Sequence, residues 1–165
     1  MVEADLALLR TWREQPHWTL WWGRPVGDEM AEALADSLLS MWLIEFEGRA
    51  FAYAQDYDPH DLPGHHFGYL PVGSRAIDQS IGDLAMVGHG HGSVFLGLYV
   101  EQLFAAGAPV IGADPHPTNA RAIRAYQRAG FAVVGSAFTP WGHKVLMECR
   151  RGQPVRPPTA AQERA

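Results

Sequence analysis

The stretch Gly88-His89-Gly90-His91-Gly92-Ser93 decides how this sequence is interpreted. Glycine stands at alternate positions, so no Cβ shields the backbone of the turn, and consecutive N–H groups are free to close on an anion. An apolar helix is predicted directly after the turn, from Ser93 to Ala106, and its N-terminal end adds positive partial charge. The turn therefore predicts a main-chain binding site for a cofactor that carries a pyrophosphate.

The elements around this turn predict a mixed α/β fold. Two apolar runs flank the tight turn Glu47-Gly48, which is typical of an antiparallel hairpin. Helices and strands alternate only in the second half, which favours a mixed sheet that is antiparallel at first and parallel around the glycine-rich turn. The predicted strands are residues 42–47, 49–57, 75–81, 109–113, 131–138 and 144–150. The predicted helices are residues 6–12, 28–40, 93–106 and 119–129, with an aromatic-rich segment at 18–22.

The chain length and the positions of proline-rich segments indicate one domain. The 165 residues suffice for a single core, which we assign to residues 1–151. The proline-rich residues 152–165 are expected to form a mobile tail. Residues 58–73 hold several prolines and glycines and predict a long loop, of a kind that is more often functional than idle.

Composition narrows the class of protein. Thirteen basic residues against eighteen acidic ones give a net charge of −5, which argues against nucleic acid and suits a cationic small molecule. The single Cys149 excludes an internal disulfide. No apolar run approaches the length of a membrane span, and the first residues are acidic, so we expect a cytoplasmic protein without membrane partners, as a monomer or homodimer.

A second motif, Asn119-Ala-Arg-Ala-Ile-Arg-Ala-Tyr-Gln-Arg-Ala-Gly-Phe131, completes a resemblance to the GNAT superfamily of N-acetyltransferases. Members of that superfamily move an acetyl group from acetyl-coenzyme A (acetyl-CoA) to an amine. The chain is most similar to the aminoglycoside 6'-N-acetyltransferases. The motifs that carry this closer resemblance are Trp21-Trp22-Gly23, Tyr53-Ala54-Gln55, Arg75-Ala-Ile-Asp-Gln-Ser80 and Asp114-Pro-His-Pro-Thr-Asn119.

The resemblance implies a GNAT fold with splayed parallel strands, acetyl-CoA as the cofactor, and a site built from three groups of residues. It implies that Asp78 and Tyr126 are catalytic. It implies substrate contacts from Asp114, Trp22, Asp61 and Tyr69. It implies cofactor contacts from Ser80, Ile81, Gly88, His89, Gly90, His91, Gly92, Ser93, Asn119 and Arg124.

The chemistry of acetyl transfer gives these residues roles. An amine that attacks a thioester must lose a proton, the oxyanion must be stabilised, and the leaving thiolate needs a proton. Asp78, an N–H group near Ser80 or Ile81, and Tyr126 are the candidates for these tasks in that order. Because an aspartate at its reference pKa of about 3.9 is a poor base for an ammonium, Asp78 is expected to act through water or to orient the amine.

Two departures from the family pattern leave alternatives open. Asp61 is the only acidic residue between Asp61 and Pro71, where a polyamine acceptor would need several. The chain also enters its first helix at Asp5-Leu6, so we expect the first edge strand to be lacking. A GNAT enzyme acting on a siderophore precursor, polyamine or peptide, or a non-catalytic sensor of coenzyme A, therefore stays as an alternative.

Structural roles compete with the catalytic ones. Asp78 could be a hydrogen-bonded carboxylate at a strand bend, Asp114 could end its strand, and Tyr126 could be a core aromatic. The histidines at 60, 65 and 66 lack the spacing of a zinc site, so no metal is expected.

Overall fold

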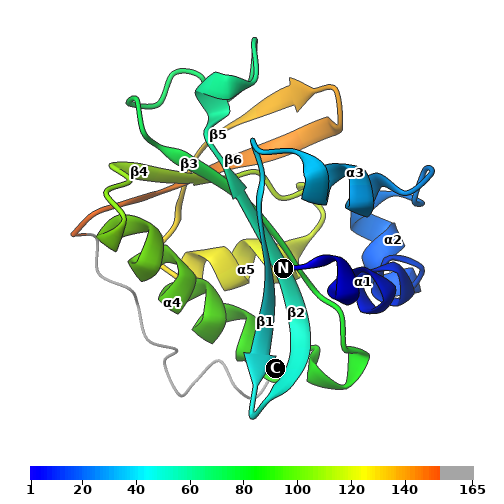
Figure 1. Cartoon of the computed structure of the whole chain (residues 1–165). Helices are drawn as coiled ribbons and strands as arrows, with labels where there is room; N and C mark the ends of the chain where they lie inside the picture. Colours follow the sequence, from blue (N-terminus) through cyan, green and yellow to red (C-terminus); the bar gives the residue numbers. More distant parts are fainter. Residues whose placement is uncertain (153–165) are drawn as a thin grey trace.

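The computed structural model describes residues 1–152, so the predicted tail lies outside them apart from Gly152. A six-stranded sheet is flanked by helices (Figure 1). The helices are α1 (Leu6–Arg13), α2 (Pro16–Trp22), α3 (Glu29–Ala35), α4 (His91–Ala105) and α5 (Ala120–Arg128). The strands are β1 (Ser40–Phe46), β2 (Arg49–Tyr57), β3 (Arg75–Ile81), β4 (Val110–Ala113), β5 (Ala132–Thr139) and β6 (Gly142–Arg150). Short 3₁₀ turns are η1 (Glu3–Asp5), η2 (Pro59–Asp61) and η3 (Leu84–Met86).

The sheet is mixed, as predicted, with the strand order β1-β2-β3-β4-β6-β5. Four of its five pairings are antiparallel, and β3 with β4 is the parallel pair. This parallel pairing is very short, since it joins only Arg75 to Ile111 and Ala76 to Gly112. Beyond those two positions β3 and β4 diverge, which opens the sheet in its middle.

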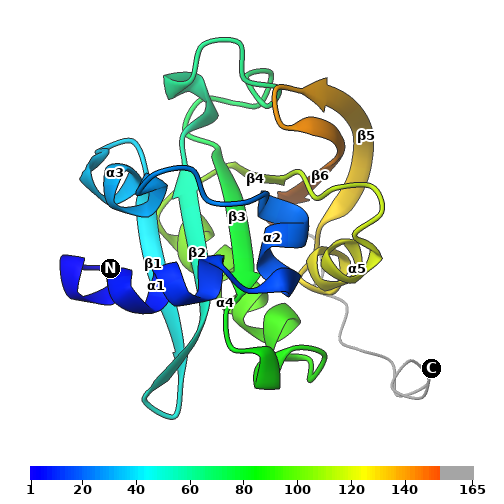
Figure 2. The ribbon, with the colours of Figure 1, turned by 90° about the vertical axis from the view of Figure 1, so that its right-hand side faces the viewer.

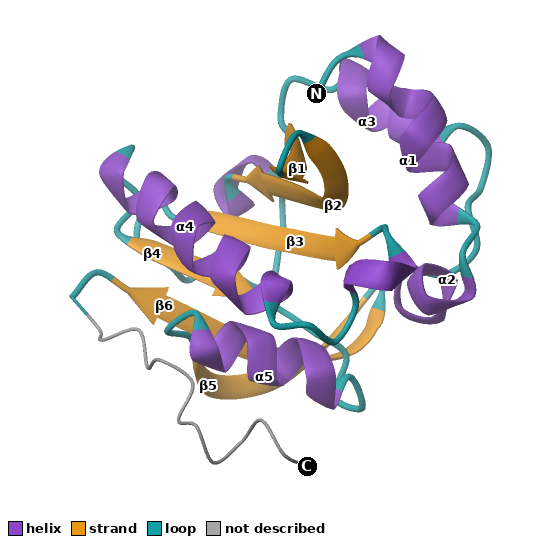
Figure 3. Ribbon diagram, turned by 90° about the horizontal axis from the view of Figure 1, so that it is seen from below, coloured by secondary structure: helices purple, strands orange, loops and turns teal. Residues whose placement is uncertain are grey.

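Helices cover both faces of the sheet (Figures 2 and 3). Because neighbouring residues of a strand point to opposite faces, each strand feeds two cores. On one face Ile77 and Ile111 pack with α4 and α5. On the other face the residues of α1, α2 and α3 pack over β1 and β2, while Ala76 packs with Phe67 of the long loop.

A close approach ties α1 to the end of β3. A Cβ at Gly82 would lie 1.9 Å from the ring of Trp12, so only glycine fits where this ring presses on the backbone. The sequence pattern did not reveal this contact, because Trp12 and Gly82 are brought together only by the packing of α1 on the sheet.

Four predicted boundaries need correction. The predicted helix 28–40 was too long, because α3 ends at Ala35, and the predicted strand 42–47 begins earlier, at Ser40. Asp36 has extended backbone (ψ 119°), and its side chain accepts a hydrogen bond from the N–H of Leu38, so a turn separates the two elements. The predicted helix 93–106 begins at His91, and the aromatic segment 18–22 belongs to a helix that Pro16 starts.

The remaining elements agree with the sequence. The hairpin β1–β2, the strand β3 and the final hairpin β5–β6 lie within one or two residues of the predicted ranges. No strand precedes α1 in residues 1–152, and β1 is an edge of the sheet. At this edge the N-terminal ammonium of Met1 donates to the carbonyl of Met41 over 3.0 Å.

Candidate active site

The divergence of β3 and β4 places two carboxylates across from each other. Ala76 and Gly112 form the last hydrogen-bonded pair, and Asp78 and Asp114 each come two residues later along their chains. Both side chains therefore point to the same face of the sheet as Ala76. This is the face covered by the long loop, opposite to α4 and α5. The opening between the strands is the centre of a large cleft.

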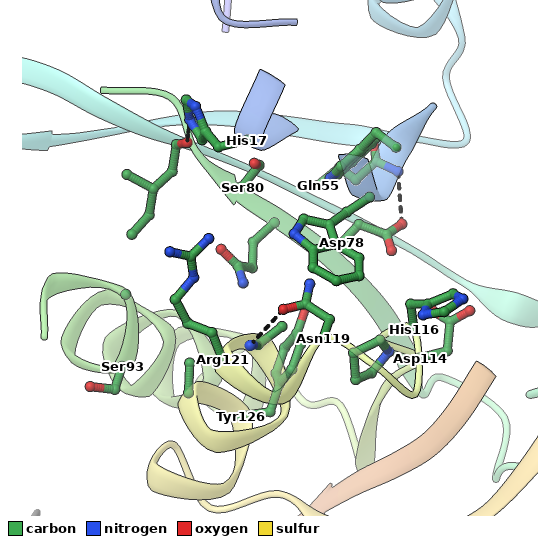
Figure 4. A pocket seen from close by; sticks show the side chains of 18 of the residues that line it. His17, Gln55, Asp78, Ser80, Ser93, Asp114, His116, Asn119, Arg121 and Tyr126 are labelled. Carbon is green, nitrogen blue, oxygen red and sulfur yellow. Dashed lines mark hydrogen bonds between the residues drawn. The ribbon is translucent and has the colours of Figure 1, made fainter. Parts of the chain in front are cut away.

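The next residue of β3 belongs to the opposite face. Gln79 points to the side of α5, where its side chain lies beside the hydroxyl of Tyr126. The cleft thus passes through the sheet at this point. Figure 4 shows Asp78 on the strand above and Tyr126 on the helix below it.

Backbone N–H groups of β3 also face this opening. Gly82 donates to the carbonyl of Phe51 on β2 over 2.8 Å. Successive N–H groups of a strand point to opposite edges of that strand. The N–H groups of Gln79 and Ile81 therefore point away from β2, toward the gap between β3 and β4. His17 of α2 holds the carbonyl of Ile81 at 2.9 Å, which fixes this end of the strand.

Asp78 is held by a neighbour on β2. Gln55 donates from Nε2 to Asp78 Oδ2 over 2.9 Å, and Gln55 Oε1 accepts from the hydroxyl of Tyr53 at 2.6 Å. Burial raises the pKa of Asp78 to about 6, and the negative charge of Asp114 acts in the same direction. The Gln55 hydrogen bond and the positive charge of Lys144 oppose this rise. A carboxyl with such a pKa is a better proton acceptor near neutrality than an ordinary aspartate.

Two glycines of the glycine-rich turn have left-handed backbone. Gly88 and Gly90 have φ of +85° and +83°, and a Cβ at either would meet nothing within 4 Å, so both open onto free space at the cleft. Gly90 is the N-cap of α4, a helix of 15 residues. The turn offers bare backbone and a helix N-terminus, a donor set that fits a pyrophosphate. His89 and Ser93 bond to backbone carbonyls of the turn itself, Val87 and Gly90.

Helix α5 forms the wall opposite this turn. Asn119 caps the helix, with Oδ1 accepting from the N–H of Ala122 at 3.1 Å (Figure 4). Tyr126 is 4% exposed and packs edge-on against Phe131. Burial raises the pKa of Tyr126 well above 10, helped by the charges of Asp78 and Asp114, so its hydroxyl keeps its proton. Three arginines of α5 line the cleft: Arg121, Arg124 and Arg128.

An aromatic wall built by α2 closes the other side. Trp22 packs against Trp18 and Tyr53, and the guanidinium of Arg13 lies 5.9 Å from the centre of its ring. Arg13 is itself buried and is paired with Glu29 of α3. This wall joins α1, α2 and α3 to the rim of the cleft.

Asp114 has two basic neighbours at the same oxygen. His66 Nε2 lies 3.3 Å from Asp114 Oδ2, and Lys144 Nζ lies 3.9 Å from it. All three side chains are at most 18% exposed. The three residues come from the long loop, the end of β4 and strand β6.

The structure brings most of the predicted residues to one cleft of about 1990 Å³. A small-ligand site usually measures about 300–1,000 Å³, so this cleft has room for two substrates. The predicted residues that line it are Trp22, Asp78, Ser80, Ile81, Gly88, His89, Gly90, His91, Gly92, Ser93, Asp114, Asn119, Arg124 and Tyr126.

The structure does not bring Asp61 and Tyr69 to this cleft within residues 1–152. Asp61 lies on the exposed turn η2, and the hydroxyl of Tyr69 donates to the buried Glu148 of β6 at 2.7 Å. Asp58 and Leu62 line the cleft from this loop instead. Sequence reasoning also missed His17 and Lys144 as parts of the site, since each is isolated in the sequence, and it weighed His66 only as a metal ligand. Gln55 and Trp21 had a signal, because both lie in the quoted motifs.

The histidines of the long loop have structural partners. His60 bonds to Asp58 and to the carbonyl of Leu70, while His65 contacts the hydroxyl of Tyr57 at 3.3 Å. In the described part of the chain, no group of three or more potential ligands is arranged around a metal. Nor does any helix between residues 1 and 152 have the length and apolarity needed to cross a bilayer.

The comparisons with known proteins agree with this geometry. The profile of the acetyltransferase (GNAT) domain family matches residues 1–137. Aminoglycoside N(6')-acetyltransferase type 1 of Klebsiella pneumoniae is 34% identical over 161 residues, which covers 89% of this chain and 79% of that protein. A structure of an aminoglycoside acetyltransferase with coenzyme A and kanamycin has a TM-score of 0.83 and 33% identity, with 92% of each chain covered. A second structure of this enzyme type, with paromomycin and acetyl-CoA, has a TM-score of 0.85 and 30% identity over 97% and 96% of the two chains.

Fold and cleft define an acetyl-CoA-dependent N-acetyltransferase. The chain belongs to the acetyltransferase (GNAT) domain family.

Proposed function

We propose that this enzyme acetylates the 6'-amine of an aminoglycoside. The observation that carries the proposal is the charge division of the cleft. Asp78 and Asp114 stand at the mouth that faces the long loop, whereas the arginines and the bare glycine turn stand at the mouth that faces α4 and α5. The first mouth suits a cationic acceptor, and the second suits an anionic donor.

The donor mouth has the groups that a pyrophosphate needs. We assign the pyrophosphate to the N–H groups between Gly88 and Ser93, with His89, His91 and Arg124 beside it. We assign Ser80, Ile81 and Asn119 to the chain that joins the pyrophosphate to the thioester. Acetyl-CoA supplies the activated acetyl group, and the residues of the chain position it.

At the acceptor mouth, Asp78 holds the reacting ammonium and takes its proton, directly or through a water molecule. A pKa of about 6 supports this role, because the group is still ionised at neutral pH yet is more basic than a free aspartate. Asp114 contacts a second polar group of the acceptor, and Trp22 forms part of the wall on which its rings rest.

The transfer then needs no covalent enzyme intermediate. The amine nitrogen forms a bond to the carbonyl carbon while the carbon–sulfur bond breaks. The N–H groups of Gln79 and Ile81, which point into the gap, stabilise the oxyanion. Tyr126 gives its proton to the departing thiolate and recovers one from the acylated nitrogen, which loses its second proton to become an amide. The raised pKa of Tyr126 keeps its hydroxyl protonated before the transfer.

We propose that the enzyme acts as a monomer or a homodimer. We place the reaction in the cytoplasm, where acetyl-CoA is available as the donor.

The test measures thiol release from acetyl-CoA with matched acceptors. Neomycin B and paromomycin I differ only in an amine or a hydroxyl at C6', so turnover of neomycin B alone supports the 6'-amine. Kanamycin, spermidine and a lysine peptide complete the series, and nuclear magnetic resonance (NMR) of the product locates the acetyl group.

Other results would favour the alternatives. Turnover of only the polyamine or the peptide would replace the aminoglycoside by another amine. Coenzyme A binding without turnover of any amine would make the chain a sensor. Acetylation of kanamycin at another nitrogen would keep the class of acceptor and reject the regiochemistry.

A further inference from the structure

Lys144 is the only lysine of this chain, and it lies inside the acceptor side of the cleft. Its side chain is 18% exposed, and its Nζ lies 3.9 Å from Asp114 Oδ2. A cation is unexpected at this position, because the proposed acceptor is itself a cation. Lys144 and Leu146 are two residues apart on β6, so their side chains point to the same face of the sheet. Leu146 packs with Ala76, which places Lys144 on the face of Asp78 and Asp114.

Asp114 is engaged from a second side as well. His66 Nε2 approaches the same oxygen to 3.3 Å, and its ring is held between His65 and Phe67 at centre distances of 4.1 and 4.7 Å. Burial and the nearby His66 lower the pKa of His65 to about 4, so His65 adds no charge at neutral pH. Lys144 and His66 are therefore the two basic side chains beside Asp114, and Lys144 is the one whose charge does not depend on a histidine.

From this arrangement we infer that Lys144 is a specificity-determining residue, which restricts the acceptor to one ammonium group at the opening between β3 and β4. The inference rests on the proposed function. Asp78 receives the reacting ammonium. Lys144 occupies the place that a second ammonium would take at Asp114, so the acceptor presents a neutral hydroxyl there.

The physical reason is charge balance. Lys144, with His66 beside it, offsets the negative charge of Asp114, and the reacting ammonium offsets that of Asp78. A second ammonium of the acceptor would meet Lys144 without a free carboxylate, and like charges repel strongly in a partly desolvated cleft. Such an acceptor is rejected by repulsion even where its shape fits.

Kanamycin A and kanamycin B are a matched pair for this test, because they differ only in a hydroxyl or an amine at C2', on the ring that carries the 6'-amine. We expect the wild-type enzyme at pH 7 to have about tenfold higher kcat/KM for kanamycin A, the size of one moderate charge–charge interaction. In Lys144→Met the preference falls to within about twofold, through a gain for kanamycin B. The KM for acetyl-CoA is unchanged.

Two control variants test whether the effect needs a positive charge at position 144. Lys144→Arg keeps a cation beside Asp114 and retains the preference. Arg10→Met removes a cation from the exposed pair with Asp28 on α1, outside the cleft, and leaves the preference unchanged. Equal rates for the two kanamycins in the wild type, or the same preference in Lys144→Met, would overturn the inference.

A binding measurement covers the case in which neither kanamycin is acetylated, which would reject the proposed function alone. Reductive methylation with ¹³C-formaldehyde labels two amines only, the N-terminus and Lys144. The inference then requires weaker binding of kanamycin B than of kanamycin A, with a shifted Lys144 resonance. Equal affinities would reject it independently of turnover.

Discussion

Gln55 Nε2 donates to Asp78 Oδ2 over 2.9 Å, across the pairing in which these residues are direct neighbours on β2 and β3. The bond keeps the carboxylate oriented at the point where β3 loses its partner β4. It also opposes the rise in pKa that burial and Asp114 cause. Asp78 is thus fixed in position and titrates near neutrality, which is the basis of the first three predictions.

Replacement of Asp78 by asparagine should remove the proton acceptor and keep the shape. We expect kcat to fall by about 10²-fold or more, the usual contribution of general base catalysis. Calorimetry should give an unchanged affinity for coenzyme A, because the glycine turn is untouched. Unaltered kinetics would exclude Asp78 from the mechanism.

The pH dependence of the rate should follow Asp78. Its active form is the carboxylate, so kcat/KM falls as the pH drops through about 6. In Gln55→Leu the stabilising hydrogen bond is lost, the pKa of Asp78 rises further, and the fall begins at higher pH. Tyr53→Phe keeps the Gln55–Asp78 bond and serves as the control. An acid limb at the same pH in Gln55→Leu would contradict this assignment.

The same pKa predicts how stability changes with pH. The folded-state pKa of Asp78, about 6, exceeds its ordinary value of 3.8, so the stability it contributes is present below about pH 4 and is lost as the pH rises through 6. Asp78→Asn has no charge to desolvate. Urea unfolding should show the variant more stable than wild type by about 1–2 kcal/mol at pH 7.5 and no more stable at pH 4.

Tyr126→Phe tests the proton donor separately. The ring keeps its packing against Phe131, so the melting temperature should change little. Loss of the hydroxyl should lower kcat by about 10–100-fold, with coenzyme A affinity preserved. Since the pKa of Tyr126 lies well above 10, the wild-type profile should show no basic limb from this group below pH 9. A normal kcat in the variant would leave Tyr126 as a core aromatic.

The glycine turn allows a control with matched backbone strain. Gly90 (φ +83°) lines the cleft, whereas Gly48 (φ +75°) turns the β1–β2 hairpin away from it, and a Cβ at either meets nothing within 4 Å. Valine is strained at both positions. Only Gly90→Val should abolish coenzyme A binding, as its side chain blocks the approach to the backbone. Equal dissociation constants for the two variants would reject the turn as the binding site.

Residue patterns along the chain predicted well the turns, the hairpins and strand β3. Gly48 and Gly107 mark turns that only glycine adopts easily, and the hairpins and β3 were placed from alternation and punctuation. The helix predicted at 28–40 was too long because Leu34, Ser37, Leu38 and Met41 continue a helical spacing. The turn at Asp36 ends it, through a hydrogen bond that periodicity does not encode.

The sequence by itself determined the two segments that we assign to the donor, Gly88–Ser93 and Asn119–Tyr126. Their signal lies in one turn and one helix, where conformation depends on neighbours along the chain. The resemblance also pointed to Asp78 and Asp114, but how the acceptor side is assembled was decided only by tertiary structure. Asp78, Gln55, His66, Asp114 and Lys144 come from five separate segments, and the early divergence of β3 from β4 brings them to one opening. The charge of that opening is a sum over residues distant in sequence, which no local pattern contains.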